Sequence, residues 1–236
     1  TRYWRDWSSD VCSSDLDALD LFGALKSVAK IQFRNSTNME KSHGRKLNLG
    51  CGFDRREGWV NADKFPKCRP DVLMDVESPP WPFESDEFDH ILMKHVLEHV
   101  GADFNNFKRI MQELYRVTKP DGLIEIQVPH FRHDTFWSDP THVRGFTLLT
   151  FEMMSKARND EWIARGANYT MVSYLMEVDF EIAQASIVYD PRWLEREKRG
   201  EVTREQLRIW SGEHWNVAKE LHVTLKAKKP FHPLTD

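Results

Sequence analysis

Long apolar runs, an excess of basic residues and a cysteine framework are all missing from this sequence. No run approaches the ~18 apolar residues of a membrane-spanning helix, so we expect no membrane segment. The formal net charge is −4, and because nucleic-acid-binding domains are typically basic, we expect no nucleic-acid partner. Three cysteines are too few for a disulfide framework or a four-cysteine metal site. A reducing, cytoplasmic setting is therefore the default expectation.

The beginning of the chain differs in character from the rest. Residues 1–16 read TRYWRDWSSDVCSSDL, which resembles the translation of a short-read sequencing adapter. We exclude them from the fold; the alternative is a genuine tail rich in serine and aspartate, and either kind of segment is expected to be disordered. Residues 17–45 are expected to form an N-terminal amphipathic helix, over residues 17–33, followed by a polar linker.

Short apolar runs alternate with helical stretches from Lys46 onward, which is typical of a parallel sheet with crossover helices. The clearest helix follows Asp103, a favourable N-cap residue, and carries apolar residues at three-and-four spacing. The turn at residues 119–122 ends that helix and starts the next strand. A charged helical insertion is expected over residues 192–210. The strands are expected at residues 46–49, 59–62, 71–74, 90–93, 123–128, 180–189 and 220–226.

The first of these strands runs into Gly50, Cys51 and Gly52. Glycine lets the backbone approach a ligand closely, because no Cβ intervenes. A dinucleotide-binding fingerprint needs a third glycine, where this chain has Arg55, and a helix that receives the pyrophosphate. The interval to the next strand is too short for such a helix. A nucleoside cofactor without a pyrophosphate needs neither, but its ribose needs a carboxylate such as Asp63 at the end of the second strand; the alternative for Asp63 is a solvated turn residue.

Four further stretches, in the matching order, resemble the type 11 group of class I methyltransferases that depend on S-adenosyl-L-methionine (SAM). They are residues 81–89 (WPFESDEFD), 95–100 (HVLEHV), 113–117 (ELYRV) and 119–122 (KPDG). The resemblance implies an α/β domain over residues 46–230 with the Rossmann-like class I methyltransferase fold. In that fold a seven-stranded, mainly parallel sheet is flanked by helices, and the last strand is inserted antiparallel. The resemblance also implies SAM as the cofactor.

The resemblance assigns roles to individual positions. Gly50, Cys51 and Gly52 would run beneath the methionine part of SAM, with Cys51 as a small residue rather than a nucleophile. Asp63 would hold the ribose. Asp75 and Val76 would contact the adenine, and Lys94 and His95 would pass the sulfonium and the methionine moiety.

Two features depart from the family pattern or leave a choice open. A short loop over residues 53–58 takes the place of the usual first helix, so contacts to the SAM carboxylate could come from Arg55, Arg56 or the N-terminal helix. Glu98 beside His99 could form an acid-base pair. We favour a structural role for both, in which they brace the loop that carries His95.

Histidines and acids crowd the segment that follows the fifth strand. The carboxyl edge of a doubly wound sheet borders the ligand-binding crevice, and a histidine there can act as the base for an alcohol acceptor. We name His133 or His130 as this base, with Asp134 as an orienting partner. In one alternative the histidines only form hydrogen bonds within the loop, and residues 139–142 cap a helix. In another, His130, His133 and Asp139 bind a divalent metal; our prediction includes no metal.

Residues 130–215 are expected to form a lid or insertion over the cleft, with aromatic side chains that could stack on a sugar-like acceptor. We predict a SAM-dependent methyltransferase that acts on a small-molecule or carbohydrate-like acceptor, with oxygen favoured as the accepting atom. The alternatives are a SAM-binding module without turnover and a nicotinamide-dependent oxidoreductase. The sequence leaves the identity of the acceptor and the oligomeric state open.

Overall fold

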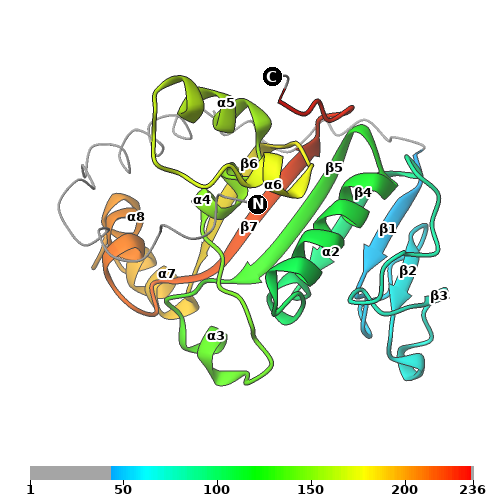
Figure 1. Cartoon of the computed structure of the whole chain (residues 1–236). Helices are drawn as coiled ribbons and strands as arrows, with labels where there is room; N and C mark the ends of the chain where they lie inside the picture. The colour runs from blue at the N-terminus through cyan, green and yellow to red at the C-terminus, as the bar shows by residue number, and fades with distance from the viewer. Residues whose placement is uncertain (1–43, 235–236) are drawn as a thin grey trace. The chain divides into compact units, whose positions relative to one another are not determined.

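Seven strands form one sheet in the computed structural model, which describes residues 44–234. The sheet order is β3-β2-β1-β4-β5-β7-β6. Neighbouring strands from β3 to β5 are parallel, whereas β7 is antiparallel to both β5 and β6 (Figure 1). This arrangement confirms the predicted Rossmann-like sheet, including its antiparallel last strand. The strands are β1 (Lys46–Leu49), β2 (Val60–Asp63), β3 (Val72–Leu73), β4 (Phe88–Lys94), β5 (Thr118–Pro129), β6 (Phe180–Tyr189) and β7 (Ala218–Ala227).

Helices connect and flank these strands. The long helix α2 lies between β4 and β5 in the chain, and four short helices separate β5 from β6. Two more helices, α7 and α8, connect β6 to β7. The helical segments are η1 (Pro66–Cys68), η2 (Leu97–His99), α2 (Phe104–Val117), α3 (Asp134–Ser138), α4 (Leu148–Glu152), α5 (Lys156–Ala164), α6 (Val172–Met176), α7 (Pro191–Lys198) and α8 (Arg204–Glu213).

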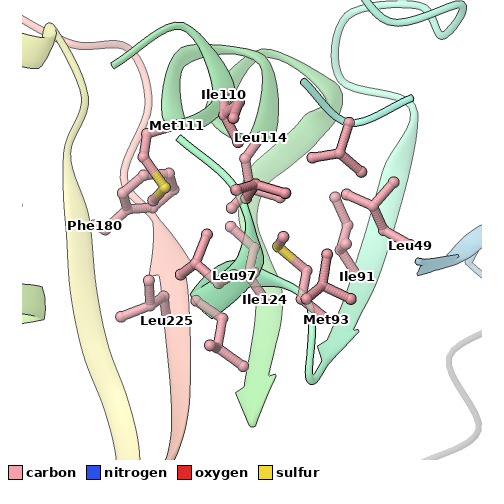
Figure 2. Close-up of a cluster of buried hydrophobic side chains, with 14 of the residues drawn as sticks. Leu49, Ile91, Met93, Leu97, Ile110, Met111, Leu114, Ile124, Phe180 and Leu225 are labelled. Carbon is pink, nitrogen blue, oxygen red and sulfur yellow. The ribbon is translucent and has the colours of Figure 1, made fainter. Parts of the chain in front are cut away.

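The main hydrophobic core lies between α2 and the sheet. Figure 2 shows Ile110, Met111 and Leu114 of the helix facing strand residues such as Ile91 and Ile124. These side chains are buried because the apolar positions of α2 recur at three-and-four spacing and so share one face. Asp103 begins the helix as its N-cap, as predicted, and its side chain accepts a hydrogen bond from the backbone N–H of Asn106.

The predicted turn at residues 119–122 lies within β5 as a bulge. Thr118 pairs with Phe88 of β4, and the next pair in register is Leu123 with His90. Residues 119–122 of β5 therefore lie opposite the single residue Asp89 of β4. Within this bulge Asp121 takes a positive φ of 58°. The predicted start of this strand was too late because α2 passes directly into the sheet pairing at Thr118.

Two connections decide how the site is built. Residues 53–58, between β1 and β2, form a loop without a helix among the described elements, as predicted. The charged insertion predicted over residues 192–210 is two helices rather than one, because the chain turns at Gly200, where φ is 74°. The segment predicted as a lid, residues 130–215, contains β6, which pairs along its length with β7.

Residues 1–43 lie outside the described part of the chain, and so do the expectations for residues 1–16 and for the helix over residues 17–33. Within residues 44–234, no helix is both long and apolar enough to cross a membrane.

The N-cap of α2 gives a direct test of this reading of the fold. Asp103→Ala should lower the free energy of unfolding by about 1 kcal/mol, because one N–H at the helix start loses its acceptor. Asp103→Ser should retain most of the stability, since serine is also a good N-cap. Urea denaturation of both variants measures the difference. Equal stability of the alanine and serine variants would contradict the capping role.

Candidate functional site

The bend after β1 needs glycine at two positions. Gly50 has a φ of 69°, and a Cβ placed there would lie 2.4 Å from Cγ2 of Val96. Gly52 has a φ of 49°, but no described atom lies within 4 Å of the position its Cβ would take. The first glycine is therefore required by packing, whereas the second leaves open space above the backbone, as a ligand-binding bend requires.

Asp63 is tied directly to this bend. Its Oδ2 accepts a hydrogen bond of 2.8 Å from the N–H of Gly52, and its Oδ1 accepts one of 2.8 Å from the N–H of Phe65. The N–H groups of Gly50 and Cys51 both donate to the carbonyl of Ala62, the residue before Asp63. The strand ends of β1 and β2 therefore present one joined surface, and the acid predicted for the ribose faces the glycine bend.

A buried polar network holds the loop that replaces the first helix. Asn48 lies in the middle of β1, and its Nδ2 donates to the carbonyl of Asp54 and to Oδ1 of Asn61. Asn61 in turn accepts from the N–H of Arg56 and donates to Asp71. These hydrogen bonds from Asn61 lower the pKa of Asp71. Two buried asparagines thus do the positioning that a helix does in other doubly wound folds.

The two arginines of this loop have different surroundings. Arg55 forms an ion pair of 2.5 Å with Asp71. The guanidinium of Arg56 lies 5.6 Å from the ring centre of Trp59, and its buried Nε has no hydrogen-bond partner within residues 44–234. Arg55 is therefore already paired, and Arg56 has more donor capacity left for an anionic ligand.

The residues predicted at the adenine lie on the turn after β3. Oδ1 of Asp75 accepts from the N–H of Glu77, and Oδ2 lies 3.8 Å from the ammonium of Lys64. Val76 is buried, and its carbonyl accepts a hydrogen bond from the indole of Trp81. Asp75 thus remains partly exposed on a turn that Val76 and Trp81 fix from below.

The end of β4 brings Lys94 and His95 to the same edge of the sheet. Nζ of Lys94 lies 3.1 Å from Oδ2 of Asp54, so this lysine reaches the loop that follows the glycine bend. His95 has a φ of 53°, which is uncommon for a residue with a side chain and is often found at functional sites. The carboxylate of Glu98, 3.4 Å from Nδ1 of His95, raises the pKa of His95, against the opposing effect of burial.

A pocket of about 330 Å³ opens beside His95. It lies at the carboxyl ends of β4 and β5 and at the start of β7, where ligands bind in doubly wound sheets. Strand β7 contributes here because it runs antiparallel to β5, so that Glu220 pairs with Pro129. The pocket is lined by His95, Glu98, His99, Pro129, Thr135, Asp139, His142, Lys219 and Glu220.

Sequence reasoning found part of this lining. It singled out the crowded segment after β5, which supplies Asp139 and His142, but it did not name Lys219 or Glu220. The predicted antiparallel insertion of the last strand carried the missing signal, since it brings the start of that strand to the carboxyl edge of β5. The aromatic side chains expected to stack on an acceptor do not belong to the lining of this pocket among the described residues.

His133 is engaged at both ring nitrogens. Its Nε2 lies 3.1 Å from Oδ2 of Asp190, and its Nδ1 accepts from the N–H of Thr135, which makes it the N-cap of α3. Its orienting partner is therefore Asp190 rather than the predicted Asp134, whose carboxylate accepts from Asn216 instead. Burial alone would raise the pKa of Asp190, but hydrogen bonds from Arg192 and His133 lower it to about 2.

His130 is buried next to this pair. It is 9% exposed, and its Nδ1 accepts from the N–H of Arg132 at 3.2 Å. Burial, reinforced by the charge of Arg132, lowers the pKa of His130 to about 4, so the ring is neutral at pH 7. Neither His130 nor His133 lines the pocket, and their assignment as the base stays a prediction.

Two groups of side chains in the described chain have the composition of a metal site. One is Cys51, Asp63 and Cys68, and the other is Glu98, His99 and His142. The predicted alternative set of His130, His133 and Asp139 is not brought together. Burial raises the pKa of Cys51 to about 12, and Cys68 donates its S–H to the carbonyl of Phe65. The thiol of Cys51 therefore keeps its proton, which fits the reading of Cys51 as a small packing residue.

Comparison with known proteins finds a family model that matches part of the chain. Residues 45–126 match the type 11 methyltransferase model, described as a methyltransferase domain. No curated protein matches the chain. Among solved structures, the chain is similar to a SAM-dependent methyltransferase from Archaeoglobus fulgidus, with 15% identity, a TM-score of 0.45 and coverage of 78% of this chain and 86% of that one.

Two further solved structures are similar to the chain at the same level. The YcgJ protein from Bacillus subtilis has 18% identity and a TM-score of 0.44, with 79% of this chain and 92% of that chain covered. A 1,6-didemethyltoxoflavin-N1-methyltransferase from Burkholderia thailandensis has 14% identity and a TM-score of 0.44, with 78% and 71% covered.

The lowered pKa of His130 predicts a pH dependence of stability. Between pH 6.5 and about 4 the unfolded chain protonates this histidine and the folded chain does not, so stability is full above pH 6.5 and is lost as the pH falls. The loss attributable to His130 should be roughly 3 kcal/mol. His130→Gln should flatten the pH profile of the unfolding free energy over this range. The same slope in the variant and the parent would rule out this contribution.

Proposed function

We propose that this chain, whose residues 45–126 match the type 11 methyltransferase model, is a SAM-dependent methyltransferase that transfers a methyl group to an oxygen atom of a small or carbohydrate-like acceptor. The family match gives the enzyme class and the cofactor, SAM. The acceptor and its oxygen atom are our inference from the pocket. The match ends within β5, so the pocket residues after Pro129 lie outside it.

The hydrogen-bond capacity of Asp63 is the observation that carries the cofactor assignment. An ionised carboxylate has about four acceptor sites, and the N–H groups of Gly52 and Phe65 fill two of them. The remaining sites suit the two hydroxyl groups of a ribose. The open space over Gly52 fits the methionine part beside it. When bound, SAM supplies an electrophilic methyl group on its sulfonium.

The residues around this cradle have separate tasks in the proposal. Asp75 and Val76 would bound the adenine, and Lys94 and His95 would lie along the methionine part. Arg56 is the better candidate for the SAM carboxylate, because Arg55 is paired with Asp71. Each of these residues would bind or orient, and none would exchange a proton with the acceptor.

The pocket beside His95 is our proposed acceptor site. Its lining includes three carboxylates and three imidazoles, which offer hydrogen-bond partners to the hydroxyl groups of an acceptor. Holding an acceptor oxygen in line with the methyl group accounts for much of the acceleration of such a displacement. The imidazoles of His99 and His142 lie where they could receive the proton of the acceptor hydroxyl.

The sequence-based prediction that His133 or His130 is the general base remains untested. A base must reach the proton that it removes, within hydrogen-bond distance or through one water. His133 already binds Asp190 and Thr135, and His130 is neutral and buried. In this proposal the pair positions the segment after β5, and Asp190 fixes the ring of His133.

Two rival functions remain to be separated from this one. A nicotinamide-dependent oxidoreductase would need a helix after the glycine bend to receive a pyrophosphate, and residues 53–58 form a loop instead. A SAM-binding module without turnover would bind SAM and yield no S-adenosylhomocysteine with any acceptor. Product formation in a screen of hydroxylated small molecules distinguishes that module from an enzyme.

The role of Asp63 can be measured without knowing the acceptor. Asp63→Ala should weaken SAM binding by about 1.5 to 3 kcal/mol, because charge-assisted hydrogen bonds to the ribose are lost. Calorimetric titration with SAM measures this loss. Glu205→Ala, which removes an exposed acid from α8, should bind SAM like the parent. Unchanged affinity in Asp63→Ala would remove this residue from the cofactor site.

The role of His133 can be tested with a substitution that keeps its capping function. Asparagine is a good N-cap residue but cannot act as a base. His133→Asn should therefore keep the turnover of the parent within about threefold, whereas loss of a general base lowers turnover about 10²- to 10⁴-fold. Formation of S-adenosylhomocysteine with an acceptor found in the screen measures both. A loss of more than about 100-fold with normal SAM affinity would establish His133 as the base.

A further inference from the structure

The carboxylate of Glu98 is buried in the wall of the pocket without a hydrogen bond. Glu98 is 1% exposed, and neither of its oxygens has a hydrogen-bond partner among the described residues. Nδ1 of His95 lies 3.4 Å from Oε1, which makes an ion pair without a well-aligned hydrogen bond. A buried carboxylate with unfilled acceptor sites is costly in a folded protein, and a bound cation is one way to offset that cost.

Two histidines present ring nitrogens to the same carboxylate. One ligand atom from each of Glu98, His99 and His142 lies within 4.8 Å of the other two. Nε2 of His99 lies 4.0 Å from Oε1 of Glu98, and the two imidazole rings are 4.5 Å apart between centres. All three residues line the pocket. The trio therefore combines two imidazoles and one carboxylate at an accessible position.

Hydrogen bonds fix the histidine ring orientations that metal ligation requires. Nδ1 of His142 lies 2.6 Å from the carbonyl of Phe136, which can only accept, so this nitrogen carries the proton. Nδ1 of His99 lies 2.9 Å from the hydroxyl of Thr141, which gives its own proton to Asp139. That nitrogen must therefore donate as well. Nε2 of each ring is left with a free lone pair.

This pattern is the usual support of a metal-binding histidine, whose second nitrogen donates to a carbonyl or to a polar group held by a carboxylate. We propose that Glu98, His99 and His142 bind a divalent first-row transition metal ion, with Zn²⁺ as the representative case. Two histidines and a glutamate leave at least one coordination position open, as in catalytic zinc sites. Mg²⁺ and Ca²⁺ are poor occupants of this site, because both ions prefer oxygen donors alone.

The catalytic role of this metal site rests on the proposed function, whereas metal binding itself does not. The three residues line the proposed acceptor pocket, so a hydroxyl oxygen of the acceptor could bind the metal ion there and would become more acidic. The lone pairs of His99 and His142 would then hold the ion, and the proton of the acidified hydroxyl would be released to bulk solvent. Acceptors with an oxygen that can reach a metal, such as vicinal diols or hydroxy acids, are the class that this site favours.

Metal binding by the purified chain tests the proposal directly. After removal of metals with a chelator, the protein should bind one Zn²⁺ in a calorimetric titration without SAM or acceptor, and Mg²⁺ should give no signal. Co²⁺ should give the visible absorption of a low-symmetry four- or five-coordinate ion. Absence of both Zn²⁺ and Co²⁺ binding would overturn the proposal while leaving SAM binding, and so the proposed function, intact.

Three variants assign the binding to this trio. Glu98→Gln should weaken Zn²⁺ binding at least 100-fold, since even the loss of a supporting hydrogen bond costs about 10- to 100-fold. Thr141→Val lies outside the trio and removes the hydroxyl that links His99 to Asp139, so it should weaken binding about 10- to 100-fold. Glu220→Gln is the matched control in the same pocket, because its carboxylate is paired with His222, and it should stay within about threefold.

The group of Cys51, Asp63 and Cys68 is the competing candidate for the metal site. Binding at Cys51 and Cys68 would give an intense near-ultraviolet charge-transfer band with Co²⁺ and would be lost in Cys68→Ser. Thermal unfolding with and without Zn²⁺ shows that each variant is folded and reports the metal-dependent stabilisation separately. Zn²⁺ affinity that survives in folded Glu98→Gln and Thr141→Val, or that disappears only in Cys68→Ser, would contradict the proposal.

Discussion

The hydrogen bond between the N–H of Gly52 and the carboxylate of Asp63 is the constraint on which the proposed cofactor site depends. The two residues are 11 positions apart, and they meet because β1 and β2 are adjacent parallel strands with Leu49 opposite Ala62. The bond orients the acid toward the bend and leaves part of its acceptor capacity unused. Without it, the glycine bend and the acid would be two unrelated features of neighbouring strand ends.

The first two strands of the sheet each carry a buried polar side chain. A central parallel strand is usually apolar on both faces, yet Asn48 and Asn61 are each 3% exposed. Their side chains satisfy the backbone of residues 53–58 and so replace the positioning effect of a helix. In our proposal the structure therefore has a cofactor half, built from β1 to β4, and an acceptor half, in which β4, β5 and β7 meet the segment after Pro129.

The sequence predicted the cofactor half better than the acceptor half, for a physical reason. Strand periodicity, the Asp103 cap and the Gly50–Gly52 bend are local signals, and each was found within a few residues of its position. Partners from distant segments leave no such signal. The 57-residue separation of His133 and Asp190 and the approach of Glu220 to His95 follow from the order of β5, β7 and β6 rather than from any local pattern. Sequence reasoning therefore chose the neighbour Asp134 as the partner of His133, whereas the folded chain uses Asp190.

The most direct test of the central claim is a crystal structure of the chain with S-adenosylhomocysteine. The account predicts that both ribose hydroxyls donate to the carboxylate of Asp63 while the N–H of Gly52 still donates to the same group. It also predicts that the sulfur atom of the ligand lies between the glycine bend and the pocket beside His95. A ligand whose ribose lies away from Asp63, or whose sulfur atom is separated from that pocket by the sheet, would contradict the account.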